Sequence, residues 1–175
     1  MRKSVNISEK LYNKINDISN SSDKEQMMVF GGRTIGDTIV VSEYSFRLCD
    51  ALYSDDDEVE IPLRVLKEFM YDINNDGYDT FFMVHSHKCN SNFFEFMYGD
   101  LSDEDEINSE RLREVCNFFG LDYYDGITTG KRVYFWNTKE KDNGPILMNC
   151  YIDNVQVEYN KLTQITEDIE HKFNL

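Results

Sequence analysis

The sequence predicts an α/β fold in which a curved mixed β-sheet is flanked by helices. Two observations favour this fold class. Apolar runs of strand length alternate along the chain with segments whose apolar residues recur at helical spacing. Short turn sequences also join some neighbouring strand runs directly, which indicates hairpins and therefore antiparallel as well as parallel pairs.

The N-terminal part of the chain predicts a helix followed by a hairpin. Residues 5–18 carry isoleucine and leucine at helical spacing, and Ser8 is the candidate N-cap. Residues 25–32 are typical of a short buried strand that ends at two glycines. Residues 37–46 are rich in β-branched side chains and predict a second strand, joined to the first through a turn at 32–37.

The middle of the chain predicts two helices around one apolar strand. The acidic stretch 54–60 predicts a solvated loop. A helix is expected over 62–77, with a proline in its first turn and a glycine after its end. An apolar strand is expected over 78–87, and a helix closed by a glycine over 102–120.

The C-terminal part predicts further strands and a last helix. Residues 123–130 and 131–137 are expected to be two strands around a Gly-Lys turn. Residues 146–152 and 155–159 are expected to be strands, and residues 161–173 a helix. No internal repeat or low-complexity linker divides the chain, so residues 1–175 are predicted to form one domain.

Charge and cysteine spacing exclude several classes of protein. A formal net charge of −15 argues against binding to nucleic acid, because such a chain cannot neutralise a run of phosphates. No two of the four cysteines form a C-x-x-C pair, and their spacing resembles neither a disulfide framework nor a zinc knuckle. The sequence shows no signal peptide and no apolar stretch of membrane-spanning length. We therefore expect a cytoplasmic protein that does not bind membranes.

The main candidate for chemistry is an H-x-H pair at the end of the apolar strand. Residues i and i+2 of a strand share a face, so His85 and His87 are expected to project their imidazoles the same way. Two imidazoles are half of a tetrahedral zinc site, and a catalytic site needs a third protein ligand. The carboxylates that follow offer candidates, among them Asp100, Asp103 and Asp105.

The same acidic segment has a purely structural interpretation. The sequence "SDED" fits a capping box in which Ser102 is the N-cap of the next helix and Asp105 occupies its third position. An isolated H-x-H is also more often incidental than metal-binding. Spacing alone therefore leaves both interpretations open.

Four motif elements, taken together and in order, resemble a known family. "VHSH" at 84–87 is followed by "SDED" at 102–105, and "EQMMVFGG" lies upstream. "YYDGITTG" resembles the strand that follows the motif helix. This pattern resembles the JAMM signature of JAB/MPN-domain metalloproteases, which runs H-x-H, a loop and S-x-x-D, with a separate glutamate upstream. The resemblance covers about residues 5–137 as a motif-bearing core, followed by C-terminal strands and a helix at 145–175.

The resemblance implies a role for each motif residue. His85, His87 and Asp105 would bind Zn²⁺ and leave one position to water. Zinc would lower the pKa of that water to about 7 and so provide a hydroxide nucleophile. Glu25 would act as the general base, and Ser102 would donate a hydrogen bond to the developing oxyanion.

The chain departs from the family pattern after the second histidine. Lys88 stands where the family usually has proline, and the 14-residue loop from there to Ser102 is longer than usual. Asp105 is preferred as the third ligand because only it satisfies S-x-x-D. Cys89 continues the period-2 series of the two histidines and is a rival ligand if the strand extends that far.

The resemblance implies a zinc-dependent metalloprotease or isopeptidase. Its substrate would be a ubiquitin-like protein or its conjugate, cleaved after the C-terminal tail in deconjugation or precursor processing. The alternatives are a non-catalytic JAB/MPN-fold scaffold and a metalloprotease acting on a sulfur-carrier or other protein.

The loop at 88–100 is unusually aromatic for a connection beside an active site. It is expected either to pack on the core or to form a wall of the substrate groove or a surface for a protein partner.

Overall fold

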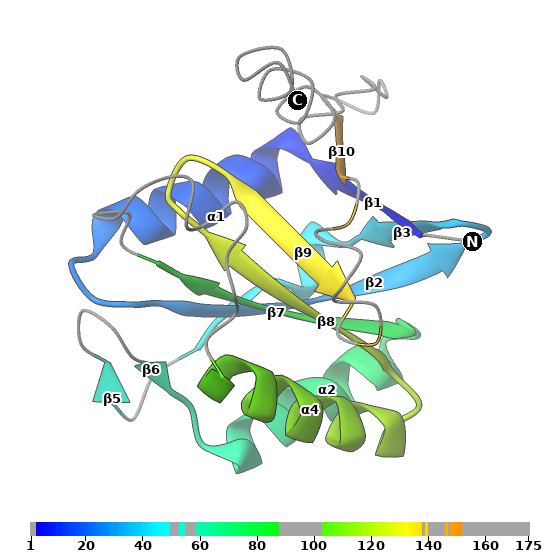
Figure 1. Ribbon diagram of the computed structural model, residues 1–175. Coiled ribbons are helices and arrows are strands. Elements are labelled where there is room, and N and C mark those ends of the chain that lie inside the picture. The colour runs from blue at the N-terminus through cyan, green and yellow to red at the C-terminus, as the bar shows by residue number, and fades with distance from the viewer. Residues whose placement is uncertain are drawn as a thin grey trace, which may run out of the picture.

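A computed structural model describes residues 3–49, 53–54, 59–87, 103–137, 139, 146 and 148–151. At its centre lies an eight-stranded mixed sheet in the order β10-β1-β3-β2-β7-β8-β9, with β4 paired to β2 beside that path. Figure 1 shows α1 on one side of the sheet and α2 and α4 on the other. The predicted α/β class with a mixed sheet is therefore confirmed. The elements are β1 (Ser4–Ser8), α1 (Glu9–Ser21), β2 (Met27–Ile35), β3 (Thr38–Val41), the 3-10 helix η1 (Glu43–Ser45), β4 (Arg47–Leu48), β5 (Tyr53–Ser54), β6 (Val59–Glu60), α2 (Leu63–Asn75), β7 (Thr80–Ser86), α4 (Asp103–Phe118), β8 (Asp122–Thr128), β9 (Val133–Asn137) and β10 (Met148–Tyr151).

Alternate residues of the central strands build two apolar cores, one on each face of the sheet. Phe82 of β7 belongs to the core under α1, where its ring stacks on Phe30 of β2 at a centroid distance of 5.2 Å. Phe81 belongs to the core under α2 and α4. Because His85 is an even number of residues from Phe81, its side chain falls on the α2 and α4 face.

The N-terminal residues form a strand where the sequence predicted helix. β1 pairs in parallel with both β3 and β10, so its extended conformation depends on strands far along the chain. Helix α1 begins only at Glu9. The predicted N-cap is confirmed, because the backbone N–H of Leu11 donates to Ser8 Oγ at 3.2 Å.

Strand β2 continues through the glycine pair, and the prediction that it ends there is wrong. A Cβ on Gly31 would lie 3.0 Å from Ile73 Cγ2 in α2. A Cβ on Gly32 would lie 2.9 Å from Ile39 Cγ2 on the opposite face. The glycines therefore allow close packing on both faces of the strand. The predicted hairpin is confirmed, since β2 and β3 pair antiparallel.

Two predictions in the following segment need correction. The range 37–46, predicted as one strand, contains β3 and η1, and the short strand β4 follows it and pairs with the first half of β2. The acidic stretch 54–60, predicted as a loop, contains part of a hairpin formed by β5 and β6. Pairing between segments overrides the local composition in both places.

The remaining described elements agree with the sequence. Helix α2 follows Pro62 and precedes Gly77, whose φ is +78°. Helix α4 is closed by Gly120, whose φ is +71°. Strands β7, β8, β9 and β10 lie where they were predicted. The strand expected at 155–159 and the helix expected at 161–173 lie outside the described residues.

The connection from β7 through α4 to β8 positions the candidate site. β7 and β8 are parallel neighbours, so α4 must run back against their direction between them. The C-terminal end of β7 and the first turn of α4 therefore lie at the same end of the sheet, as Figure 1 shows. The H-x-H pair and the first turn of the α4 backbone therefore lie toward the same end.

We predict that Gly126→Ala lowers the free energy of unfolding by about 1–3 kcal/mol, as overpacking of a close-packed core does. Gly126 lies between Val84 and Phe135 in the sheet register. An added Cβ would lie 2.7 Å from Val84 Cγ2 and 3.1 Å from Phe135 Cδ1. Urea unfolding measures the change. In a Val84→Ala background the substitution should cost less, because the methyl group that it meets is gone; equal costs in both backgrounds would contradict the steric explanation.

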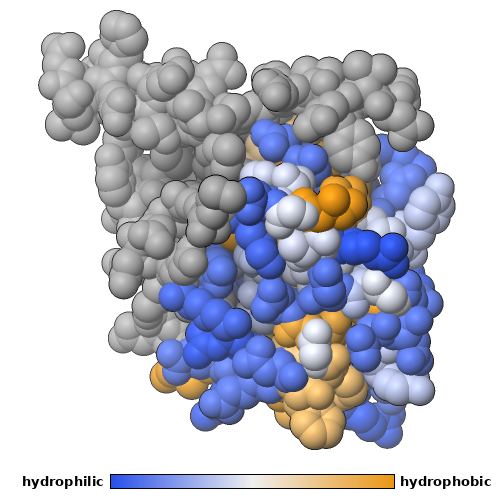
Figure 2. All heavy atoms as spheres, turned by 90° about the vertical axis from the view of Figure 1, so that its right-hand side faces the viewer, coloured by the Kyte–Doolittle hydropathy of each residue, from blue (hydrophilic) through white to orange (hydrophobic). Residues whose placement is uncertain are grey.

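The coloured part of the face shown in Figure 2 is mainly hydrophilic. Its apolar areas are small, and the largest lies low in the view, on the side where Figure 1 places α2 and α4. This polarity agrees with the acidic composition of the chain. None of the helices in the described ranges combines the length and the apolar character that crossing a membrane requires.

Candidate metal centre

The two histidines of the H-x-H pair converge at the end of β7. His85 is the sixth residue of the strand and is 5% exposed, whereas His87 follows the strand and is half-buried. Their Nε2 atoms lie 2.8 Å apart, and their ring centroids 4.8 Å apart. At this distance the two Nε2 atoms form a hydrogen bond, and which of them donates depends on the tautomers. Both rings therefore direct the same nitrogen to one point. Two ligands of one tetrahedral zinc ion would lie about 3.4 Å apart, so the rings would have to separate slightly to hold a metal between them.

The backbone around the pair is held by neighbouring strands. The backbone N–H of Ser86 donates to Gln26 O at 2.9 Å, and that of Gln26 donates to Ser86 Oγ at 2.8 Å. The backbone N–H of His87 donates to Thr128 O at 2.9 Å. His87 thus remains attached to β8 although it lies past the last residue of β7.

Glu25 lies just before β2, the strand next to β7, on the same face of the sheet as the histidines. β2 and β7 pair antiparallel with Met27 opposite His85. Continuing this register by two residues, through the Gln26 contacts just described, places Glu25 opposite His87 on the same face. Directly opposed residues have Cβ atoms about 4.5–5.5 Å apart. A carboxylate that is 5% exposed, 60 residues away in sequence, is therefore brought next to the H-x-H pair.

The other two predicted site residues come from the start of α4. Asp105 is the third residue of this helix, and its side chain lies outside the described part of the structure. Ser102 immediately precedes the helix and lies outside it as well. Position 105 is one turn, about 6 Å along the axis, before Ser109, which contacts the sheet. The backbone of α4 thus brings position 105 to the end of the sheet that carries the histidines.

Two residues near the histidines were missed by sequence reasoning. Asp125 of β8 is 2% exposed, and its Oδ1 lies 3.9 Å from His85 Nδ1. Ser109 of α4 donates a hydrogen bond from Oγ to Asp125 Oδ2. The signal that could have found Asp125 is its position inside a run of aromatic and β-branched strand residues, because aspartate is rare in strands and rarely buried.

Among the residues whose side chains are described, no group of three or more His, Cys, Asp or Glu side chains is arranged to hold a metal ion. A metal ion bound by the two histidines would need a third ligand from a side chain beyond this set. The rival ligand Cys89 and the carboxylates Asp100 and Asp103 lie outside the described side chains, as Asp105 does.

The buried cysteine of α4 is not a competing reactive group. Burial raises the pKa of the Cys116 thiol to about 12. Its Sγ lies 3.8 Å from Met70 Sδ, inside the core between α2 and α4. Because the thiolate is the form that attacks electrophiles and binds metals, Cys116 has a structural role at neutral pH.

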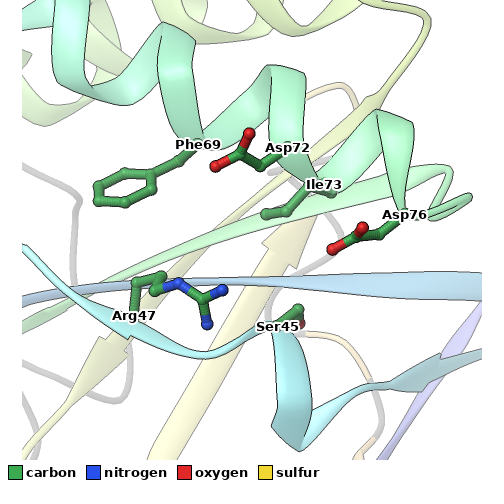
Figure 3. A pocket seen from close by; sticks show the side chains of 6 residues that line it. All are labelled: Ser45, Arg47, Phe69, Asp72, Ile73 and Asp76. Atoms are coloured by element: carbon green, nitrogen blue, oxygen red, sulfur yellow. The ribbon is translucent and has the colours of Figure 1, made fainter.

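A small cavity between α2 and the η1–β4 segment is separate from the histidines (Figure 3). It holds about 10 Å³, which is room for about one water molecule. It is too small to bind a substrate, and no residue of the candidate centre lines it. Its lining residues are Ser45, Arg47, Phe69, Asp72, Ile73 and Asp76.

Comparison with known proteins gives little guidance. No protein family and no curated protein matches the chain. Among solved structures, the chain is similar to the solution structure of the protein DSY2949 from Desulfitobacterium hafniense, with 15% sequence identity and a TM-score of 0.46. That alignment covers 89% of this chain and 99% of the other. The function has to be inferred from the side chains at the end of β7.

Proposed function

We propose that the chain is a zinc-dependent peptidase of the JAB/MPN type, which cleaves a peptide or isopeptide bond after the tail of a ubiquitin-like protein. One observation carries the proposal. Glu25 and the His85–His87 pair come from two separate parts of the sequence, and the register of β2 and β7, continued by two residues, brings them to one end of the sheet. This proximity supports the grouping that the JAMM resemblance implies. A packing requirement alone does not explain two imidazoles and a carboxylate collected on one buried face.

The donor set fits zinc. Zinc in catalytic sites is bound by three protein ligands, commonly histidine nitrogens and carboxylate oxygens. Nε2 of His85 and Nε2 of His87 already converge, and Asp105 would supply the third ligand from the first turn of α4. When bound, zinc acts as a Lewis acid and lowers the pKa of coordinated water.

The chain's own residues would then move the protons. Glu25 accepts a proton from the attacking water as the new C–O bond forms at the scissile carbonyl carbon. It returns that proton to the leaving nitrogen as the C–N bond breaks, so the products are a free carboxyl group and a free amine. Ser102 donates a hydrogen bond to the carbonyl oxygen while negative charge develops on it.

An extended tail suits this position in the fold. The candidate centre lies at the end of the inner strands β2 and β7, and the short strand β4 pairs with β2 close by, with no second partner among the described residues. A peptide could add to β4 as a further strand and present its backbone to the site. Hydrogen bonds from strand addition are independent of sequence, so they would orient the scissile bond while side-chain contacts select the partner. We therefore place the tail of a ubiquitin-like protein, or of a similar small protein, in this role.

The direct test is hydrolysis of a fusion in which a reporter follows a ubiquitin-like tail. The purified protein should cleave it, 1,10-phenanthroline should stop cleavage, and added zinc should restore it. A protein that carries zinc but cleaves no tail fusion or conjugate would refute the peptidase proposal and favour the scaffold alternative. A protein that carries no zinc would refute the metal centre itself.

The aromatic loop gives a second prediction. If residues 88–100 contact a folded substrate, replacing 90–98 by a short Gly/Ser link should leave zinc content unchanged. It should slow cleavage of a full-length conjugate far more than cleavage of a short tail peptide, since only a folded partner can bury so much aromatic surface. The two rates and the melting temperature are measured together. A large loss of thermal stability with equal effects on both substrates would show that the loop packs on the core.

A further inference from the structure

We propose that Asp125 is a positioning residue for His85: held by Ser109, it favours the proton of the imidazole on Nδ1 and so presents the Nε2 lone pair at the point where a metal would bind. The inference rests on the proposed metal centre, because it assigns the partner of one of its ligands. It concerns residues outside the H-x-H and S-x-x-D motifs.

The geometry around Asp125 fixes its carboxylate from two sides. Ser109 Oγ donates to Oδ2, and the backbone N–H of Gly126 donates to Oδ1 at 2.9 Å. Ser109 itself is 3% exposed. A carboxylate held by a buried hydroxyl and by its own backbone has little freedom to turn, so Oδ1 stays beside His85 Nδ1, at 3.9 Å.

This contact favours one tautomer of His85. A carboxylate is only an acceptor, so the ring nitrogen that faces it is favoured as the N–H nitrogen. In a neutral imidazole the other nitrogen then carries the lone pair. That nitrogen is Nε2, which lies 2.8 Å from His87 Nε2 and in this tautomer accepts the hydrogen bond from it. Asp125 thereby selects the form of His85 that can bind a metal at the point where the two rings converge.

The contact at 3.9 Å is longer than a hydrogen bond, yet both groups are almost fully buried. An electrostatic interaction is screened little in such surroundings. Metal-ligating histidines characteristically donate their second nitrogen to a carboxylate or carbonyl, which orients the ring and raises its basicity as a ligand. Asp125 occupies this position relative to His85.

The same network links the two elements that would supply ligands. Ser109 ties α4 to β8, and His85 on β7 pairs with β8 in parallel register. Position 105 lies four residues before Ser109 on the same helix. The hydrogen bond between Ser109 and Asp125 therefore helps to fix the position of α4 along β8, and through β8 its position relative to β7, which carries His85.

The test compares zinc affinity across matched variants, measured by competition with a chromophoric chelator. Asp125→Asn keeps the shape but removes the charge, and should weaken zinc binding roughly 10- to 100-fold. Ser109→Ala should weaken it less, in the same direction. Thr80→Val is the control: Thr80 is fully buried on β7, and its hydroxyl donates to Asp79 at 2.8 Å. This variant should retain wild-type affinity even where it lowers stability.

A second readout does not need the metal. In the metal-free protein, ¹⁵N chemical shifts of the His85 imidazole should show the proton on Nδ1, and Asp125→Asn should move the population toward Nε2–H. If Asp125→Asn fails to fold, the tautomer of His85 in the wild-type protein and the zinc affinity of Ser109→Ala test the inference instead. Wild-type affinity in folded Asp125→Asn, or a wild-type proton on Nε2, would overturn the inference. A wild-type protein that binds no zinc would instead refute the proposed function, while the tautomer still tests the role of Asp125.

Discussion

Replacing His87 by alanine is expected to reduce bound zinc from about one ion per chain to almost none. The reason is geometric: Nε2 of His87 and Nε2 of His85 converge, so removing one imidazole leaves a single nitrogen donor at that point. Because His87 is only half-buried and lies past the last residue of β7, the fold should tolerate the change. Elemental analysis of the protein after gel filtration measures the metal content, and circular dichroism checks the fold.

Three further variants separate the ligand set from its rivals. Asp105→Ala should lose zinc as His87→Ala does, and full retention in that variant would show that another residue supplies the third ligand. Cys89→Ala should retain zinc, which would remove the H-x-H-x-C alternative. His171→Ala is the matched histidine control, since it removes the third histidine of the chain and lies far from the motif in sequence.

Glu25→Gln is expected to lower the hydrolysis rate by roughly 10²–10⁴-fold while zinc content and fold stay unchanged. Glutamine has the size of glutamate and can form hydrogen bonds, but it cannot take up and return a proton at neutral pH. The register of β2 and β7, continued by two residues beyond Met27 and His85, places Glu25 opposite His87 and beside the candidate centre. Turnover of the tail fusion under saturating substrate measures the effect.

The control for this variant makes the same chemical change elsewhere. Glu110→Gln converts an exposed carboxylate of α4 to an amide and should leave turnover unchanged. If Glu25→Gln keeps the wild-type rate, Glu25 is not the base. If it loses zinc, Glu25 contributes to metal binding and its assigned role is wrong.

Much of the fold was determined by local sequence patterns. Pro62 and Gly77 bound α2, and Gly120 closes α4, because proline suits a helix start and glycine adopts the positive φ that ends one. The turn residues around position 130 correctly predicted the antiparallel pair of β8 and β9. Period-2 alternation in the strand already placed both histidines on one face. The order of Glu25, the H-x-H pair and the S-x-x-D segment, which resembles the JAMM signature, named the candidate site residues.

The tertiary structure decided what depends on partners distant in sequence. Residues 4–8 became β1 because β3 and β10 pair with it on either side, although the local spacing favoured helix. Gly31 lies inside β2 because it pairs with Phe81 of β7, and it is glycine because α2 packs closely against it; no local pattern reveals either contact. Only the register of β2, β7 and β8 and the packing of α4 brought Glu25 opposite His87 and Asp125 beside His85. The sequence by itself determined which reactive side chains the chain carries. Strand register and helix packing decide which of these side chains meet, because register and packing are set by contacts between segments and not by the residues within a single segment.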